Sequence, residues 1–205
     1  PKQVEDTLIA KRQDLRERFE FGALGEMVNK AAQIEPMIAH GWREALTVKL
    51  PPFHSDHVVS QTVAMHKMQR DAGFARAKSV VVIPHCRLSG ATRIAGYLTS
   101  ALAELQGESE VLVVSTDLDI MMFPEWFPAG CRHVSLSRYA ESLPRALREK
   151  LLVEFIRSLG ATQVFNVNSS LFWDAFKSFG KALSVTSDVY AYFFCNDKDA
   201  LGHWT

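Results

Sequence analysis

The sequence predicts an α/β fold in which a parallel sheet has helices on both faces, preceded by a helical extension. From Ser79 onward, short runs rich in Val, Ile and Phe alternate with longer stretches of helical spacing. This alternation is typical of strand–helix–strand units that build a parallel sheet. Residues 1–78 show helical spacing and no alternating strand pattern. We therefore expect a helical extension over 1–78 and a sheet domain over 79–205.

The helical extension is expected to contain separate helices. Apolar residues with helical spacing indicate helices over 4–19 and 27–34, and Pro36 interrupts the second pattern because proline is poorly tolerated inside a helix. The Pro-Pro pair at 51–52 indicates a loop, and a third helix is expected over 57–70.

Five strands are expected in the sheet domain. The first contains an uninterrupted Val-Val-Val-Ile run, which favours a strand buried on both faces, as parallel sheets require. The expected strands are 80–83, 110–115, 133–136, 162–167 and 188–195.

The segments between the strands have helical patterns, with one exception. The helix after Gly90 is indicated by apolar residues at Ile94, Tyr97, Leu98, Ala101, Leu102 and Leu105. A second helix is expected to be capped by Ser142 and ended by Gly160, and a third to start after Ser169 and end at Gly180. The exception, 120–131, is expected to be a structured loop whose core-filling residues are Met121, Met122, Phe123 and Phe127.

Composition excludes several classes of protein. Of the 205 residues, 47% are hydrophobic, and 23 Lys and Arg balance 23 Asp and Glu. The zero net charge argues against a nucleic-acid-binding protein, which usually has a basic excess. Cys86, Cys131 and Cys195 form no C-x-x-C pair, as expected of reduced thiols in a cytosolic protein. No apolar run has the roughly 18 residues that a membrane span needs, and no signal peptide is visible.

The loop from Pro84 to Arg93 is the strongest functional signal. Small residues at a helix start leave backbone N–H groups free for an anion or phosphate, although the loop can also be a turn that needs one glycine. A dinucleotide fingerprint requires three glycines and an acid about 20 residues later. Gly90 and Gly96 do not satisfy it, and no G-K-[ST] follows. NAD binding and ATP hydrolysis are therefore poorly supported.

The stretch PHCRLSGATRIAGYLTSALAEL resembles the opening of the family 4 nucleotide-sugar glycosyltransferases, which have the two-domain GT-B fold. Gly90, Ala91 and Arg93 match a Gly-Gly-Ala-(Glu or Thr)-Arg type of sequence, and Ser89 stands where the first glycine usually does. The later NVNSSLFWDAFKSFGKALS and VYAYFFCNDKDALG are similar to bacterial members that build surface polysaccharides. The resemblance spans 79–205 and implies a Rossmann-like sheet, one half of a GT-B fold.

The resemblance implies a hexosyltransferase with a nucleotide sugar as co-substrate, no metal, and a glycan or lipid-linked acceptor. In such enzymes this domain chiefly binds the acceptor, and a C-terminal domain binds the donor. No such second half is recognisable before Thr205, so this chain alone is expected to be incomplete and inactive. We expect a cytoplasmic protein, with peripheral contact to the inner face of the membrane if the acceptor is lipid-linked.

The candidate site residues lie where the expected strands end, since ligands of parallel sheets bind at the carboxyl edge. By resemblance, the loop facing the donor phosphates is Ser89, Gly90, Ala91, Thr92 and Arg93. The candidates for acceptor binding are His85, Asp117, Trp126, Asn166, Asn168 and Ser169. Asn168 or Ser169 can instead cap the next helix, and His85 can be a structural residue. No catalytic residue is assigned. The segment 196–199 follows the last strand and is a further candidate.

Neither the histidine pair at 54 and 57 nor Cys86 is assigned a function, and two alternatives to a glycosyltransferase remain open. His54 and His57, together with Asp56, have a metal-like spacing, but no fourth ligand lies near them. Cys86 is excluded as a nucleophile acting with His85, because adjacent residues at a strand end point in opposite directions. The open alternatives are a nucleotide-dependent oxidoreductase with a degenerate fingerprint and a non-catalytic module in which 1–78 docks a partner.

Overall fold

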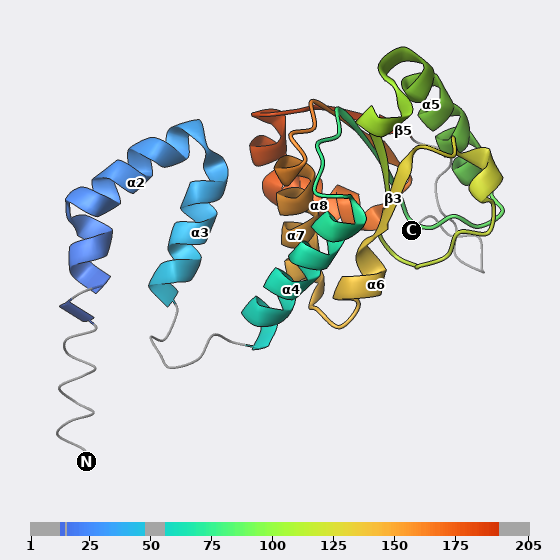
Figure 1. The fold of residues 1–205 in the computed structure, drawn as a ribbon. Helices are drawn as coiled ribbons and strands as arrows, with labels where there is room; N and C mark the ends of the chain where they lie inside the picture. Colours follow the sequence, from blue (N-terminus) through green and yellow to red (C-terminus); the bar gives the residue numbers. More distant parts are fainter. Residues whose placement is uncertain (1–12, 15, 48–55, 193–205) are drawn as a thin grey trace, which may run out of the picture. The chain divides into compact units, whose positions relative to one another are not determined.

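The structure is a computed structural model, and it describes residues 13–14, 16–47 and 56–192. The chain divides into two compact units, Pro1–Phe53 and His54–Thr205. The first unit is helical where it is described, and the second holds the sheet (Figure 1).

The helical unit confirms the expected interruption by proline. Helix α2 (Ala23–Ile34) is followed by its cap residue Glu35, and α3 (Pro36–Thr47) begins at the next residue. Proline is well placed there, because the first helical position has no intrahelical N–H bond to lose. Residues 16–21 are also helical, whereas most of the first expected helix lies outside the described residues.

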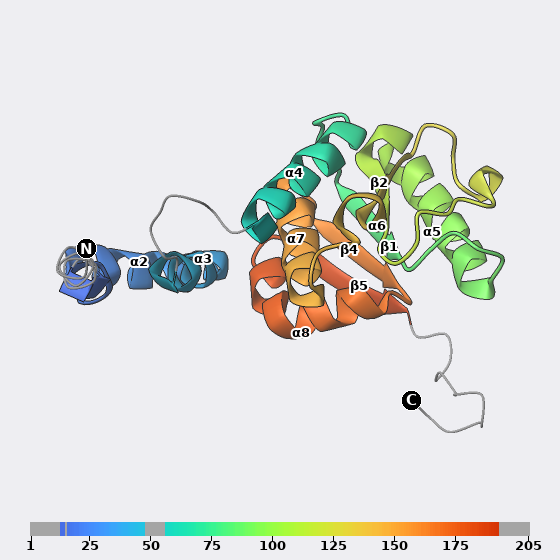
Figure 2. The ribbon, with the colours of Figure 1, turned by 90° about the horizontal axis from the view of Figure 1, so that it is seen from below.

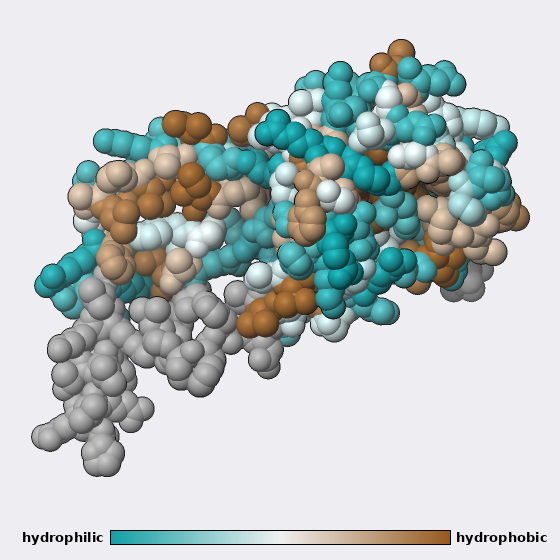
Figure 3. Space-filling view, in the orientation of Figure 1, coloured by the Kyte–Doolittle hydropathy of each residue, from teal (hydrophilic) through white to brown (hydrophobic). Residues whose placement is uncertain are grey.

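Much apolar surface of this unit is exposed. The space-filling view shows brown patches over α2 and α3 (Figure 3). The exposed fractions are 77% for Phe21, 66% for Met27 and 77% for Ile34. Contiguous apolar surface is characteristic of contact surfaces.

The second unit contains a five-stranded, all-parallel sheet in the order β3-β2-β1-β4-β5. This confirms the predicted Rossmann-like fold class. Its strands are β1 (Ser79–Ile83), β2 (Val111–Ser115), β3 (Arg132–Ser135), β4 (Gln163–Val167) and β5 (Asp188–Tyr192). Residues 193–195 of the last expected strand lie outside the described residues.

Helices cover both faces of this sheet (Figures 1 and 2). Helix α5 (Gly90–Gln106) lies on one face against β1, β2 and β4. The opposite layer consists of α4 (Asp56–Asp71), α6 (Leu136–Ala140), α7 (Arg145–Ser158) and α8 (Ser170–Ser184). Strand order reverses between β1 and β4, and right-handed crossovers therefore send α5 and α8 to opposite faces.

Helix α4 contacts β3, α6 and α7, and its Met68 is completely buried. These contacts group α4 with the sheet, so the boundary between the two units falls between residues 53 and 54 of the chain. The sequence placed the division at residues 78 and 79. That difference arises because a polar helix pattern does not reveal what the helix packs against.

The structure confirms the predicted helix α5. However, the residues that it buries are mostly not the large apolar residues whose spacing predicted the helix. Tyr97 and Leu105 are 60% and 81% exposed. The buried side chains are mostly small: Thr92, Ala95, Gly96, Thr99, Leu102 and Ala103. Small residues allow the helix backbone to approach its neighbours closely, and this requirement overrides the hydrophobic pattern.

Two helix starts also differ from expectation. The third strand ends at Ser135, whose Oγ accepts a hydrogen bond from the Arg138 amide at 3.4 Å, so α6 replaces the end of the expected strand. Pro144, rather than Ser142, is the cap residue of α7. Gly160 follows this helix with a φ of +67°, which confirms the glycine stop.

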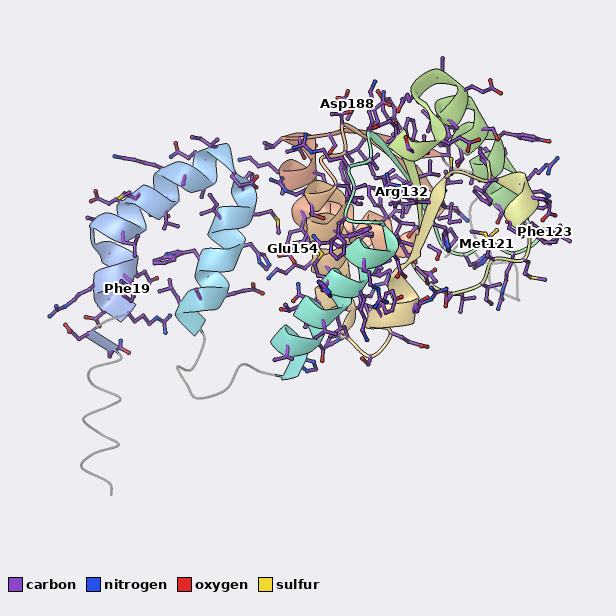
Figure 4. The ribbon with its side chains drawn as sticks, viewed as in Figure 1. Phe19, Met121, Phe123, Arg132, Glu154 and Asp188 are labelled. Carbon is purple, nitrogen blue, oxygen red and sulfur yellow. The ribbon has the colours of Figure 1, made fainter. Side chains whose placement is uncertain are left out.

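The segment 120–131 is a structured loop, as predicted. It contains the 3₁₀ helix η2 (Pro124–Trp126) and pairs with the β1 end through a bridge between Cys86 and Met121. Met121 and Phe123 lie together beside α5 (Figure 4) and pack on the core with Phe127. Met122 was wrongly expected in the core, since it is 57% exposed.

Candidate functional site

A pocket of about 520 Å³ lies at the carboxyl ends of β1 and β4. Ligands of open parallel sheets bind at this position, because the loops that leave the two strands diverge to opposite faces. The volume lies within the range of roughly 300–1,000 Å³ found for small-molecule sites. The lining consists of Ile83, Pro84, His85, Ser89, Gly90, Ala91, Thr92, Ile94, Val167 and Asn168.

One wall is the first turn of α5. Ser89 caps the helix, since its Oγ accepts a hydrogen bond from the Thr92 amide at 3.1 Å and lies 2.9 Å from Thr92 Oγ1. Thr92 Oγ1 also donates to the carbonyl oxygen of His85 at 3.4 Å. The amides of Gly90 and Ala91 have no described partner, as is usual for the first N–H groups of a helix. These amides are available to a ligand.

His85 follows β1 and lines the same pocket. Its Nδ1 atom is buried and has no hydrogen-bond partner in the described part of the chain. The structural alternative for His85 required a hydrogen bond within the protein. None is described for Nδ1, and this ring nitrogen is closed off from solvent.

Asn168 lines the pocket from the β4 side. Its φ is +68°, a left-handed conformation that asparagine adopts more readily than most residues. The neighbouring turn fixes this conformation, because Asn166 Oδ1 accepts a hydrogen bond from the Ser169 amide at 3.0 Å. Asn168 is exposed, and its side chain is free to meet a ligand.

Asn166 and Ser169 have structural roles in this geometry. Both are completely buried. Ser169 caps α8 by accepting a hydrogen bond from the Phe172 amide at 3.2 Å, and its hydroxyl lies 2.8 Å from Thr116 Oγ1. Asn168 and Ser169 were both candidates for the cap of this helix, and Ser169 is the residue that caps it. Neither Asn166 nor Ser169 lines the pocket.

Arg93 lies outside the pocket lining, although it belongs to the expected loop. Its guanidinium carbon lies 4.8 Å from the ring centre of Tyr97 and 4.9 Å from that of Trp126. Arg93 Nε also donates to the Tyr97 hydroxyl at 3.0 Å. Trp126 stacks on Phe123 at 4.3 Å between ring centres. The arginine thus joins α5 to the 120–131 loop.

Asp117 lies at the end of β2 and is held from two sides. Its amide donates to the Pro84 carbonyl oxygen at 2.8 Å, and its Oδ1 accepts from Thr116 Oγ1 at 2.8 Å. Neither Asp117 nor Trp126 lines the pocket. The structure therefore brings six of the eleven candidates together: His85, Ser89, Gly90, Ala91, Thr92 and Asn168.

A charged group lies near the β2 and β3 ends, and sequence reasoning missed two of its members, Arg138 and His133. Arg138 Nε and Nη2 donate to the two carboxylate oxygens of Asp119 at 2.7 and 3.1 Å. These hydrogen bonds lower the pKa of Asp119. Burial lowers the pKa of the neighbouring His133, whose Nε2 lies 3.1 Å from Ser115 Oγ. Only the fold brings these residues together, so no local spacing could have indicated the group.

The described residues support neither a metal site nor a reactive cysteine. No group of three or more His, Cys, Asp or Glu side chains suited to a metal ion occurs in 13–14, 16–47 or 56–192. His54 lies outside these ranges, as does the candidate segment 196–199. Cys86 is completely buried, and desolvation raises the pKa of its thiol. A buried thiol with a raised pKa is a poor nucleophile.

Comparisons of the chain with protein-family models, with curated proteins and with solved structures find no match. Over the described residues, no helix has the length and apolar character that crossing a membrane requires.

Proposed function

We propose that residues 79–205 are the acceptor-binding domain of a nucleotide-sugar-dependent glycosyltransferase for glycan or surface polysaccharide synthesis. One observation carries the proposal. The Ser89–Thr92 loop, on which the resemblance to family 4 enzymes rests, lines one pocket together with His85 and Asn168. That pocket occupies the place in the sheet where a Rossmann-like domain binds its ligand.

The lining suits the chemistry of glycosyl transfer. An acceptor hydroxyl attacks the anomeric carbon of the donor sugar, the bond from that carbon to the diphosphate breaks, and the nucleoside diphosphate leaves with the hydroxyl proton on its phosphate oxygen. The N-terminus of α5 favours a nearby negative charge by about 0.3–1 kcal/mol, without a metal ion. The Asn168 amide can donate to and accept from hydroxyl groups.

The proposed enzyme also needs a domain that binds the nucleotide sugar, and this part of the proposal rests on the resemblance alone. A cytoplasmic location at the inner face of the membrane belongs to the same proposal, with a lipid-linked acceptor there. The printed chain is then expected to bind acceptor sugars but not to transfer a glycosyl group.

Saturation-transfer difference NMR on the 205-residue chain tests the proposal. The probes are the methyl glycosides of glucose, galactose and mannose, with NADH as the competing ligand. A Cβ at Gly90 meets no atom within 4 Å, so Gly90→Phe is expected to fill the pocket and to weaken sugar binding. Gly41→Phe is the matched control, because Gly41 in α3 also has free space around it.

Each other result points to a different function. NADH binding that Gly90→Phe abolishes, without sugar binding, supports the oxidoreductase and overturns the proposal. Absence of binding by every sugar and by NADH also overturns it and favours an interaction module. Sugar binding that survives Gly90→Phe places the sugar outside this pocket and removes the observation on which the proposal rests.

A further inference from the structure

Two tyrosines on the edge strand β5 expose their rings. Tyr190 and Tyr192 are 43% and 39% exposed, and β5 lies at the edge of the sheet beside β4 (Figure 2). Side chains two residues apart in a strand point to the same face of a sheet. Both rings therefore belong to one face, and we call them the tyrosine pair.

The tyrosine pair lies on the face of the sheet that α5 covers over the neighbouring strands. Tyr190 is the register partner of Phe165 in β4, and Tyr192 is the register partner of Val167. Partners in adjacent strands project from the same face of the pleat. Phe165 and Val167 belong to the core cluster that also contains Ala95 of α5. The tyrosine pair thus continues this face to the exposed edge of the sheet.

The tyrosine pair is continuous with the pocket at the β1 and β4 ends. Val167 lines that pocket, and Tyr192 occupies the next position across the sheet. Adjacent strands are only about 4.7–4.9 Å apart. A ligand that fills the pocket and extends past Val167 therefore meets the ring of Tyr192.

This surface suits a ligand with a flat, uncharged face. Tyr190 stacks on Phe165 with 4.8 Å between ring centres and 14° between ring planes, so β4 holds the ring in place. The four side chains on this part of the face carry no charge: Phe165, Val167, Tyr190 and Tyr192. A tyrosine combines an apolar ring with a hydroxyl group that donates and accepts hydrogen bonds. A pyranose ring matches it, because its C–H groups form an apolar face and its hydroxyl groups lie at the rim.

We propose that the tyrosine pair is a second sugar subsite, which binds the next ring of an oligosaccharide whose terminal ring occupies the pocket. This inference rests on the proposed function and narrows the acceptor to a chain of at least two sugar rings. The continuity of the tyrosine pair with the pocket favours a sugar over a protein or a lipid as the occupant.

Titration calorimetry on the 205-residue chain tests the subsite. The first probes are the methyl glycosides of glucose, galactose and mannose. The second probes are disaccharide methyl glycosides that carry the binding sugar as their terminal ring, in α and in β linkage. One disaccharide is expected to bind about two- to tenfold more tightly than the monosaccharide, which is the range that contacts between two aromatic rings cover.

Substitutions in β5 show whether the tyrosine pair provides this gain. Tyr192→Thr and Tyr190→Thr remove a ring but keep a residue that favours strands. Each is expected to bind the disaccharide no more tightly than the monosaccharide, and an unchanged monosaccharide affinity shows that the pocket is intact. Tyr192→Phe keeps the ring and is expected to keep the gain.

The matched control is Tyr97→Leu. Tyr97 is also an exposed tyrosine, but its ring contacts Arg93 on α5. This variant is expected to keep the full gain from the second sugar ring. Tyr192→Val is expected to lose the gain and decides the matter if Tyr192→Thr fails to fold, which circular dichroism would show.

The outcomes separate this inference from the proposed function. If the wild type binds no sugar, the proposed function fails and the subsite fails with it. If it binds a monosaccharide and every disaccharide equally, the subsite is overturned and the proposed function stands. A gain that survives both threonine substitutions would place the second ring elsewhere and overturn the subsite alone.

Two further results would also overturn the subsite. Equal losses of monosaccharide and disaccharide affinity in Tyr192→Thr would make Tyr192 a part of the pocket itself. Self-association of the wild type in analytical ultracentrifugation, if Tyr192→Thr abolishes it, would show that a second copy of the chain covers the tyrosine pair.

Discussion

Arg132 connects three segments through backbone carbonyl groups. It lies at the start of β3 (Figure 4). Its Nη1 donates to the carbonyl oxygens of Ala72 and Ala75 at 2.6 and 3.3 Å, and its Nη2 donates to those of Arg76 and Ser109, both at 2.6 Å. The planar guanidinium holds the connection between α4 and β1 beside β3, a geometry that a lysine ammonium cannot reproduce.

Replacing Arg132 by Lys is expected to lower the free energy of unfolding by about 1.5–3 kcal/mol, since charge-assisted hydrogen bonds are lost. Urea denaturation measures the change. Arg87→Lys is the control, because Arg87 is exposed and surface substitutions usually stay within about 0.5 kcal/mol. Equal effects of the two substitutions would show that the four carbonyl contacts contribute little.

Residue patterns predicted the loop that lines the pocket but not the role of each residue in it. Small residues between a strand and a helix indicate free amides, and Gly90 and Ala91 line the pocket. The outward position of Arg93 depends on Tyr97 and Trp126. Trp126 comes from a loop 33 residues later in the sequence, so local spacing carried no information about this contact.

Among the elements, α5 and the 120–131 loop approach each other closely at Gly96. A Cβ added there would lie 2.5 Å from the backbone oxygen of Trp126. Backbone atoms yield less readily than a flexible side chain, so a larger residue at this position must displace the helix or η2. Gly96 therefore sets the distance between the helix and the loop.

Gly96→Ala is expected to destabilise the protein although alanine favours helices by about 1 kcal/mol over glycine. Overpacking costs about 1–3 kcal/mol, which outweighs that gain. The midpoint of thermal unfolding, followed by circular dichroism, measures the net effect. Gly90→Ala in the same helix is the control and is expected to be neutral or stabilising, as its Cβ meets nothing within 4 Å. A higher midpoint for Gly96→Ala would contradict the close approach.

Strands were predicted more closely than helix faces. All five strands begin within one residue of their expected starts. For β1 and β2, burial of every residue leaves apolar runs that the sequence displays directly. Helix α5 shows the limit of pattern reading. Its stripe of large residues predicted a helix correctly, but close approach to the sheet selected the small residues for the buried face. Tertiary packing decided between the two faces.

At the scale of the whole molecule, the two compact units predict where the chain can be divided. A protein starting at residue 54 is expected to unfold cooperatively in urea, since it keeps every described strand together with helices α4 to α8. A protein starting at residue 79 lacks α4 and is the matched comparison. It loses the burial of Met68 and Ala64 and is expected to be less stable by on the order of 3 kcal/mol.

Equal stability of the two shortened proteins would restore the division at residues 78 and 79 that the sequence indicated. Failure of the protein starting at residue 54 to unfold cooperatively would show that residues 1–53 are needed for the sheet unit. Both results come from the same urea titrations, followed by fluorescence and circular dichroism.

The pocket at the β1 and β4 ends is formed by two strands that lie far apart in the sequence. Val82 and Asn166 are register partners, although more than eighty residues separate them along the chain. Closing so long a loop is entropically costly and slow, and the pocket exists only once it has closed. A ligand of the pocket therefore binds only chains that have completed this pairing, and by mass action it protects them from unfolding. Ligand occupancy would report the completed assembly of the sheet.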